Sequence, residues 1–312
     1  MALYWLWNER NGGNKITMQT KPLGRLATTP FKHRQFRLPG KQKTLVNLAL
    51  LLILIPIVMM IITPYLWMLT ASLKERGSIG EPPYLYPTTF DFTNYQKAFE
   101  GAPFARYYFN TIIVAVTVVV SRVLIGGMAA YAFTFLKFKG RDALFLIYLS
   151  TMMIPFYAIV IPIYLIIRDL NWFNTYQALI VPRMVDAFAI LLFRQAFIAV
   201  PRDYIEAARV DGASHWSVLW KIVMPMSLST MLTVAIFSFL FIWNDFLWPL
   251  LAANEDKMRL IQTGLQAFNG RYNTEWTYLM AGTVIATIPP ILIFLVAQKQ
   301  FISGLARSGL KG

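Results

Sequence analysis

Long apolar stretches alternate with shorter polar ones along the chain, and six of the apolar stretches are long enough to cross a membrane. A helix needs about 20 predominantly apolar residues to span the hydrocarbon core of a bilayer. The stretches cover residues 45–71, 108–135, 142–167, 177–199, 226–251 and 277–298. This pattern predicts an all-α, polytopic membrane protein with six transmembrane helices.

The polar stretch of residues 201–225 lies between the fourth and fifth apolar stretches. Its charged side chains would each cost about 2.5–3.5 kcal/mol at the centre of a bilayer, and together roughly 15–20 kcal/mol. They are Arg202, Asp203, Glu206, Arg209, Asp211 and Lys221. We therefore expect these residues to form a loop outside the lipid.

The distribution of Lys and Arg predicts which side of the membrane each loop occupies. These residues are concentrated in the N-terminal tail 1–44, in the turn 137–141, in the polar loop and near the C-terminus, and they are sparser in the loop 72–107. Cytoplasmic loops carry the excess of positive charge. We therefore expect both termini and the polar loop to be cytoplasmic, and the loop 72–107 to face outward. The core 108–303 would then hold five helices, followed by a cytoplasmic tail, 304–312.

Composition supports a membrane protein and excludes several kinds of site. The chain is 57% hydrophobic and 14% charged, whereas soluble domains average about 25% charged residues. It has no cysteine and two histidines, which excludes thiolate chemistry and argues against a histidine metal centre. The net charge is +14, and the Lys and Arg residues that produce it lie mostly between and beyond the apolar stretches. We therefore expect contact with the lipid bilayer and no nucleic-acid partner.

Local signals predict two short helices within the polar loop. Tyr204–Asp211 has good helix formers, and Gly212 follows where a helix end favours a left-handed residue. Ser214 can cap a second helix over residues 215–224, which we expect Pro225 to end. The apolar side chains of the loop are too many for a fully solvated surface, so we expect a partner to cover them; they are Ala207, Ala208, Val210, Trp216, Leu219 and Trp220.

The spacing of these residues resembles the cytoplasmic-loop signature of binding-protein-dependent ABC importer permeases. That signature is Glu-Ala-Ala, three residues, Gly, nine residues, then Ile-x-Leu-Pro. It is met here by Glu206, Ala207, Ala208, Gly212, Ile222 and Pro225, with Met224 in place of leucine. The segments "FIWNDFLWPLL" at 241–251 and "GLARSGLKG" at 304–312 resemble the carbohydrate (maltose-type) branch. The resemblance covers about residues 45–312.

The resemblance implies a type I ABC importer permease fold in a bacterial inner membrane. In such importers the loop is a coupling helix that docks into an ATPase subunit, and closure of the ATPase dimer switches the permease between inward- and outward-facing states. Carried over, Glu206 would be the charged anchor, Ala207 and Ala208 would allow close approach, and Gly212 would be the bend. The coupling residues would be Glu206, Ala207, Ala208, Asp211, Gly212, Ile222 and Pro225, with Lys311 and Gly312 as further contacts.

The implied partners are a second permease subunit in a heterodimer, an ATPase dimer and an extracytoplasmic solute-binding protein. The chain has no phosphate-binding loop of the G-x-x-x-x-G-K-[ST] type. We therefore expect a non-catalytic subunit that binds no cofactor itself, with ATP and Mg²⁺ on the partner ATPase.

Candidate residues for the substrate pathway lie in and near the spans. Trp243, Asn244, Asp245 and Trp248 could stack on and hydrogen-bond a sugar, or the two tryptophans could belong to an interfacial aromatic belt. Arg122 and Arg183 are intramembrane charges, and they keep an anionic sugar, such as a uronate oligomer, as an option. We also expect Arg183 to pair with Asp186, three residues away on one helix face.

Prolines and small residues predict features of the spans themselves. Pro155 and Pro162 in the third span, and Pro289 and Pro290 in the sixth, would break helices and free backbone carbonyls. They would suit a gate or be ordinary kinks. Gly126, Gly127 and Ala130 form a small-residue face suited to close packing.

The rival functions are an intramembrane enzyme, a proton- or ion-coupled secondary transporter of a small polar solute, and a channel. The plausible in-span acids, Asp186 and Asp245, lie on different predicted helices, which disfavours an enzyme. A secondary transporter usually shows buried titratable residues or an inverted repeat, and a channel would leave the polar loop unexplained. The residues alone leave open which sugar is carried and whether Met1 or Met18 is the native start.

Overall fold

The computed structural model describes residues 40–269 and 274–309, and the predicted tail 1–44 lies almost entirely outside them. The chain divides into two units, residues 1–57 and 58–312. Helix α2 (Gly40–Ala71) begins in the first unit and ends in the second. The described residues are overwhelmingly helical, and their one β interaction is an isolated bridge between Asn269 and Thr274.

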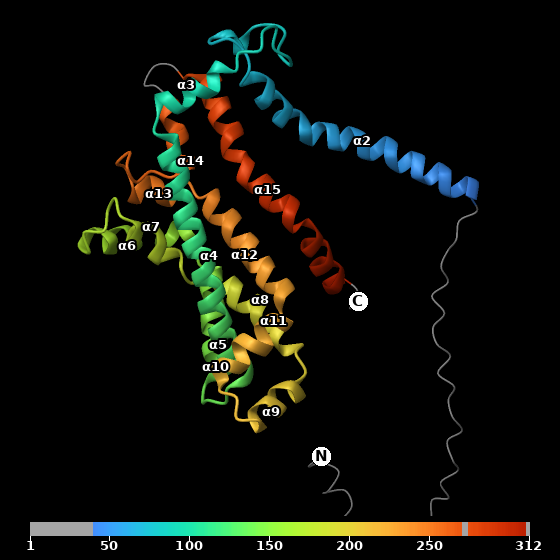
Figure 1. Cartoon of the computed structure of the whole chain (residues 1–312), viewed down its shortest axis with the longest axis vertical. Helices are drawn as coiled ribbons and strands as arrows, with labels where there is room; N and C mark the ends of the chain where they lie inside the picture. Colours follow the sequence, from blue (N-terminus) through green and yellow to red (C-terminus); the bar gives the residue numbers. More distant parts are fainter. Residues whose placement is uncertain (1–39, 270–273, 310–312) are drawn as a thin grey trace, which may run out of the picture. The chain divides into compact units, whose positions relative to one another are not determined.

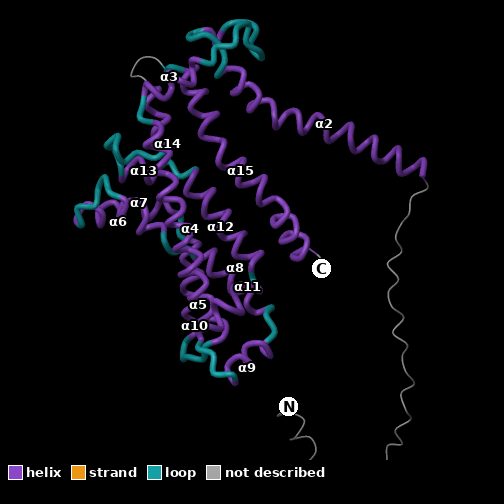
Figure 2. Tube along the Cα trace, viewed as in Figure 1, coloured by secondary structure: helices purple, strands orange, loops and turns teal. Residues whose placement is uncertain are grey.

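The second unit is a set of helices of very different lengths (Figures 1 and 2). Its long helices are α4 (Phe104–Phe135), α12 (Leu228–Trp243) and α15 (Trp276–Gly309). The shorter α-helices before the polar loop are α3 (Thr93–Gly101), α5 (Arg141–Ser150), α6 (Phe156–Asp169), α7 (Tyr176–Ile180) and α8 (Ala187–Ile198). The short α-helices after α12 are α13 (Leu247–Ala252) and α14 (Ile261–Gly264). Single 3₁₀ turns are η1 (Ser78–Gly80), η2 (Thr151–Met153), η3 (Val181–Arg183) and η5 (Leu265–Phe268).

The described helices lie where the spans are predicted, but some of the predicted spans are broken into two helices. By length and composition, Thr44–Ala71, Phe104–Phe135 and Trp276–Gln298 could each cross a membrane unbroken. Three further crossings are possible if bent helix pairs count as single spans. The pair that matches the third predicted span bends by 98° between Met153 and Phe156, and the pair that matches the fourth bends by 43° between Arg183 and Ala187.

Proline accounts for one of these breaks, whereas the helices continue through the other predicted prolines. Pro155 is the residue before α6, and Ile154 before it is extended, at φ −84° and ψ 114°, as expected for a residue that precedes proline. In contrast, Pro162 lies inside α6, and Pro289 and Pro290 lie inside α15. The expectation that these three prolines break their helices was therefore wrong.

Helix α4 packs against α8 and α12, and α12 packs against α15. The predicted small-residue face explains the first contact. A Cβ at Gly126 would lie 3.4 Å from Phe193 and 3.5 Å from Ala189, and a Cβ at Gly127 would lie 3.1 Å from the Met224 sulfur. Ala130 is fully buried in the same cluster. These small side chains let α8 approach α4 closely.

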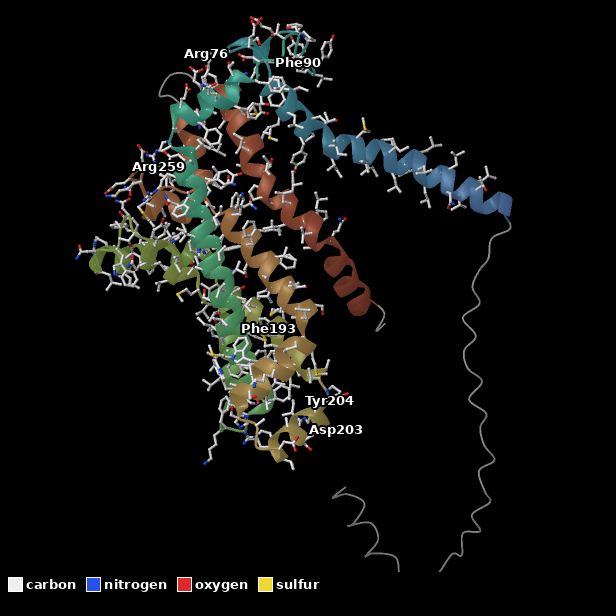
Figure 3. All side chains as sticks on the ribbon, in the orientation of Figure 1. Arg76, Phe90, Phe193, Asp203, Tyr204 and Arg259 are labelled. Atoms are coloured by element: carbon white, nitrogen blue, oxygen red, sulfur yellow. The ribbon has the colours of Figure 1, made fainter. Side chains whose placement is uncertain are left out.

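The segment between α2 and α4 is held by hydrogen bonds from buried polar groups. Asn94 on α3 donates to the carbonyls of Ser72 and Lys74. The buried Lys74 ammonium donates to the carbonyls of Glu81 and Pro83. The Arg76 guanidinium pairs with Glu275, just before α15, at 2.5 Å, and Figure 3 labels Arg76 at this end of the unit.

Acidification is expected to release this last contact. The hydrogen bond from Arg76 and then its charge lower the pKa of Glu275 below its ordinary value. Because the folded-state pKa is lowered, the pair stabilises the fold above the ordinary glutamate value of about 4.3, and this contribution is lost as pH falls through the lowered pKa. Hydrogen exchange of residues 76–80, corrected for intrinsic rates, should therefore accelerate as the pH falls from about 5 to about 3. In Glu275→Gln, residues 76–80 should exchange fast at both pH values. If their exchange accelerated with falling pH as much as in the wild type, the assignment would be contradicted.

Candidate functional site

The polar loop folds as two helices that meet at Gly212. Helix α9 covers Arg202–Val210, and Gly212 follows with φ +81°. The amide of Gly212 donates to the carbonyl of Arg209 at 3.2 Å, and that of Ala213 donates to Ala208 at 2.9 Å. The left-handed glycine and the bond back to Ala208 close the helix end as the sequence predicts.

The second helix of the loop begins where predicted and ends later. The Ser214 hydroxyl accepts from the amide of Ser217 at 3.1 Å, which confirms it as the cap of α10 (His215–Val218). The helix continues through a π-helical turn, η4 (Leu219–Val223), into α11 (Met224–Met226). The expectation that Pro225 ends the helix was wrong. After the wider π turn, Pro225 lies in the first turn of a new α-helical segment, where its missing N–H is not needed.

One face of the loop is anchored in the core and the other is exposed. Ile205, Val218 and Leu219 are buried in the cluster around α4 and α8, and the Tyr131 hydroxyl on α4 is 2.9 Å from Nδ1 of His215. Val210 and Trp216, by contrast, are 86% and 62% exposed. Figure 3 shows Asp203 and Tyr204 on α9 at the end of the unit far from Arg76.

The residues of the family signature lie mainly on the exposed side. Glu206, Ala207, Asp211, Gly212 and Pro225 are exposed, and Ala208 and Ile222 are half-buried. The Glu206 carboxylate forms no ion pair with any residue that the structure describes. An unpaired carboxylate beside exposed small and aromatic side chains is a surface that a protein partner can cover.

A second candidate site is a cluster of four charged residues inside the helix bundle. Arg122 on α4 and Arg183 on η3 are 6% and 8% exposed. Arg183 Nη2 donates to Asp245 Oδ2 at 2.7 Å, and Arg122 Nη1 lies 3.7 Å from Asp186 Oδ2. Arg122 Nε also donates to the backbone carbonyl of Arg183 at 2.9 Å.

The expected pairing of Arg183 with Asp186 was therefore wrong. The two residues do not share a helix face, because η3 ends at Arg183 and Asp186 is extended, at φ −140° and ψ 123°. The Asp186 carboxylate instead caps α8 by accepting from the amide of Phe188 at 3.4 Å. Each arginine consequently pairs with an acid on another element.

Aromatic rings and a cavity surround this cluster. The Arg183 guanidinium lies 4.0 Å from the ring centre of Phe156, and both arginines lie 5.2 Å from that of Phe241. A cavity of about 490 Å³ lies beside Arg122 and Asp186. Its remaining lining is Phe188, Ala189, Val234, Phe237, Ser238, Leu240 and Phe241.

The two tryptophans predicted to line the substrate pathway lie in the core. Trp243 and Trp248 are each 1% exposed, and their indole N–H groups donate to the carbonyls of Ala286 and Ala178, both at 2.9 Å. Their rings therefore present no free face for stacking a sugar, and they do not form an interfacial belt. Asn244 is exposed at the end of α12, where its side chain donates to the carbonyl of Leu240.

The sequence interpretation missed the aromatic lining contributed by Phe188, Phe237 and Phe241. Phenylalanines that face a cavity have the same sequence signal as those that face lipid, so no pattern distinguished them. Asp186 was recognised as an in-span acid, but its position on the cavity wall depends on the break before α8.

Comparison with known proteins identifies the class to which this fold and loop belong, an integral membrane subunit of a transport system. Residues 122–307 match the family of binding-protein-dependent transport system inner membrane components. The chain belongs to this family, and it is accordingly an inner-membrane permease component.

Two curated relatives match over most of the chain. The sn-glycerol-3-phosphate transport system permease protein UgpE of Rhizobium meliloti (strain 1021) is 31% identical over 83% of this chain and 95% of the relative. The arabinooligosaccharides transport system permease protein AraQ of Bacillus subtilis (strain 168) is 30% identical over 87% of this chain and 98% of the relative. A solved chain from a bacterial ABC transporter involved in the import of the acidic polysaccharide alginate has a similar fold. Its TM-score is 0.76 at 23% identity, over 84% of this chain and 98% of that chain.

Proposed function

We propose that this chain is the transmembrane permease of an ATP-driven importer for a sugar or oligosaccharide, including acidic ones such as a uronate oligomer. It forms the pathway with a second permease, receives its substrate from a solute-binding protein and couples to an ATPase dimer. The exposed two-helix loop around Gly212 is the observation that carries this proposal. The names of the relatives support it, since they include carriers of a sugar oligomer and of an anionic polyol phosphate.

The proposed coupling surface is the exposed face of the loop. Glu206 is the charged anchor for the ATPase, and Ala207 and Ala208 allow the two backbones to approach closely. Asp211 and Gly212 form the bend, and Ile222 and Pro225 belong to the second helix. The buried anchor residue Ile205 and the contact of His215 with Tyr131 support this role, because they transmit movement of the loop to α4.

The proposed topology has six spans, with both termini on the cytoplasmic side together with the loop. Three unbroken helices and the two bent pairs at the third and fourth predicted spans support five of these crossings. Helices α12 and α13 lie where the fifth span is predicted. The second helix of the loop meets α12 at 84°, so it does not continue the direction of the next span. This angle is suited to a helix that lies along the membrane surface.

The proposed substrate pathway passes the charged cluster. Arg122, Arg183, Asn244 and Asp245 remain in this proposal, whereas the burial of Trp243 and Trp248 leaves these two residues a packing role. ATP and Mg²⁺ belong to the partner ATPase. The secondary-transporter alternative gains no support, since the family to which the chain belongs is described as binding-protein-dependent.

Gly212→Pro tests the coupling role. Proline requires φ near −65° and lacks an N–H, whereas Gly212 has φ +81° and its amide donates to Arg209. The tagged chain is purified from its native membrane in mild detergent, its partners are identified and ATP hydrolysis is measured. We expect the wild type to bring a second permease and an ATPase, and the variant to lose the ATPase or its stimulation by the binding protein.

Gly77→Pro is the matched control, because Gly77 also has a positive φ, +89°, but lies in the segment after α2. It should keep the ATPase. If the wild type purifies alone and Gly212→Pro changes nothing, the loop is a surface feature and the coupling proposal fails.

A further inference from the structure

The cavity beside the charged cluster has a polar corner in a mainly apolar lining. Arg122 and Asp186, 3.7 Å apart, form this corner, and Ser238 is the third polar residue of the lining. The corner adjoins the break between η3 and α8, where the backbone is irregular. Irregular backbone at membrane depth is tolerated where it is buried in protein or lines a water-filled cavity.

The two arginines differ in their access to the cavity, because Arg122 lines it and Arg183 does not. Arg183 is enclosed by Phe156, Phe241 and a 2.7 Å bond to Asp245. A guanidinium has five N–H donors, and within the described residues Arg122 makes one hydrogen bond, from Nε to the carbonyl of Arg183. Its ion pair with Asp186, at 3.7 Å, is too long for a hydrogen bond. Arg122 therefore retains Nη donors at the cavity wall.

Asp186 can release Arg122 without losing its other role. Its side chain is 29% exposed, compared with 11% for Asp245. It also caps α8 through the amide of Phe188, and this bond does not depend on the arginine. The Arg122–Asp186 pair is thus the looser of the two pairs, and it opens onto the cavity.

We propose that this corner is an anion subsite in which a carboxylate or phosphate group of the transported sugar or polyol displaces Asp186 and bonds to the Nη groups of Arg122. Both groups can accept two parallel N–H bonds from a guanidinium. The Phe188, Phe237 and Phe241 side chains offer apolar contact for the remainder of the molecule. Asp186 is then the counter-ion that holds Arg122 when the site is empty, and a neutral sugar cannot replace it. This inference rests on the proposed transport function.

Asp186→Asn is the decisive variant, because asparagine caps a helix as well as aspartate does and lacks the competing charge. The wild-type complex with its partner subunits is placed in nanodiscs without the binding protein. The affinities of an alginate trisaccharide, sn-glycerol-3-phosphate and neutral arabinotriose are measured by saturation-transfer NMR. We expect the wild type to prefer the anionic probes. Asp186→Asn should bind them about fivefold more tightly, since a partly exposed ion pair no longer competes, with the affinity for arabinotriose unchanged.

Asp142→Asn is the matched control, since Asp142 is an exposed acid on α5 that pairs with Arg194. It should change no affinity. The carboxylate and phosphate probes identify which anion the corner prefers. Failure of both to bind the wild type, or an equal response of Asp142→Asn and Asp186→Asn, would overturn the subsite. ATP-driven activity of the same preparations tests the transport function separately.

Discussion

Replacing Asp245 with alanine is expected to lower the free energy of unfolding by about 3–5 kcal/mol, because the change leaves a buried arginine without its partner. Arg183 is 8% exposed and donates to Asp245 at 2.7 Å. Its Nε is already buried without a hydrogen-bond partner among the described residues. Water cannot readily reach the freed guanidinium, so the desolvation cost is not recovered. Denaturant unfolding of the purified protein in detergent, followed by tryptophan fluorescence, measures the loss.

Two further variants distinguish loss of the pair from loss of packing. Arg183→Met combined with Asp245→Leu removes both charges and should recover most of the stability, since apolar replacement of a whole buried pair is often neutral. Glu255→Ala breaks the exposed pair with Lys257 and should cost under about 1 kcal/mol. The assignment is wrong if Asp245→Ala costs no more than Glu255→Ala.

The polar loop could be predicted closely because its signals are local. Gly212 must be left-handed to end α9, and Ser214 caps the next helix within three residues of itself. Such contacts depend on neighbours in the sequence, and the structure contains both the left-handed Gly212 and the Ser214 cap. The π turn at Leu219–Val223 was not predictable, since no residue type marks the extra residue in the turn. It moved the helix end beyond Pro225.

The charged cluster could not be predicted because its contacts are long-range. Arg122 and Asp186, like Arg183 and Asp245, are about 60 residues apart in the sequence. Spacing suggested Arg183 with Asp186, but that pairing assumed an unbroken helix through residues 184–186. The break reverses the choice of partner, and it also places Asp186 on the cavity wall.

Proline was an unreliable guide to broken spans for a physical reason. Pro155 immediately precedes α6, and both Pro155 and Ile154 are extended, so the two helices of this pair are bent by 98°. Pro162, Pro289 and Pro290 each remove one backbone N–H from a continuous helix. Neighbouring helices support a membrane helix against that loss. Sequence alone does not say which prolines have such support.

Gly264→Ala is expected to be among the most damaging single-methyl additions in the chain, because no space exists for a Cβ. An ideal Cβ there would lie 2.2 Å from Cδ2 of Tyr107 and 2.6 Å from its Cε2. Tyr107 is 1% exposed and packs against the buried ring of Phe104, so its ring cannot move aside without displacing a buried neighbour. Overpacking of this kind costs about 1–3 kcal/mol and occasionally more. The same fluorescence-monitored unfolding measures it.

Gly101→Ala is the matched control, since its Cβ would meet Phe268 at an ordinary 3.5 Å. It should change stability by less than about 0.5 kcal/mol. Tyr107→Leu should restore part of the loss in Gly264→Ala, because the shorter side chain vacates the space that the new methyl needs, although it costs stability in the wild type. Tyr107→Leu would thus lower stability in the wild type and raise it in Gly264→Ala, and this change of sign is expected for a direct clash between the two side chains. Equal and additive losses would contradict the clash, since a glycine-to-alanine change should by itself favour the helix.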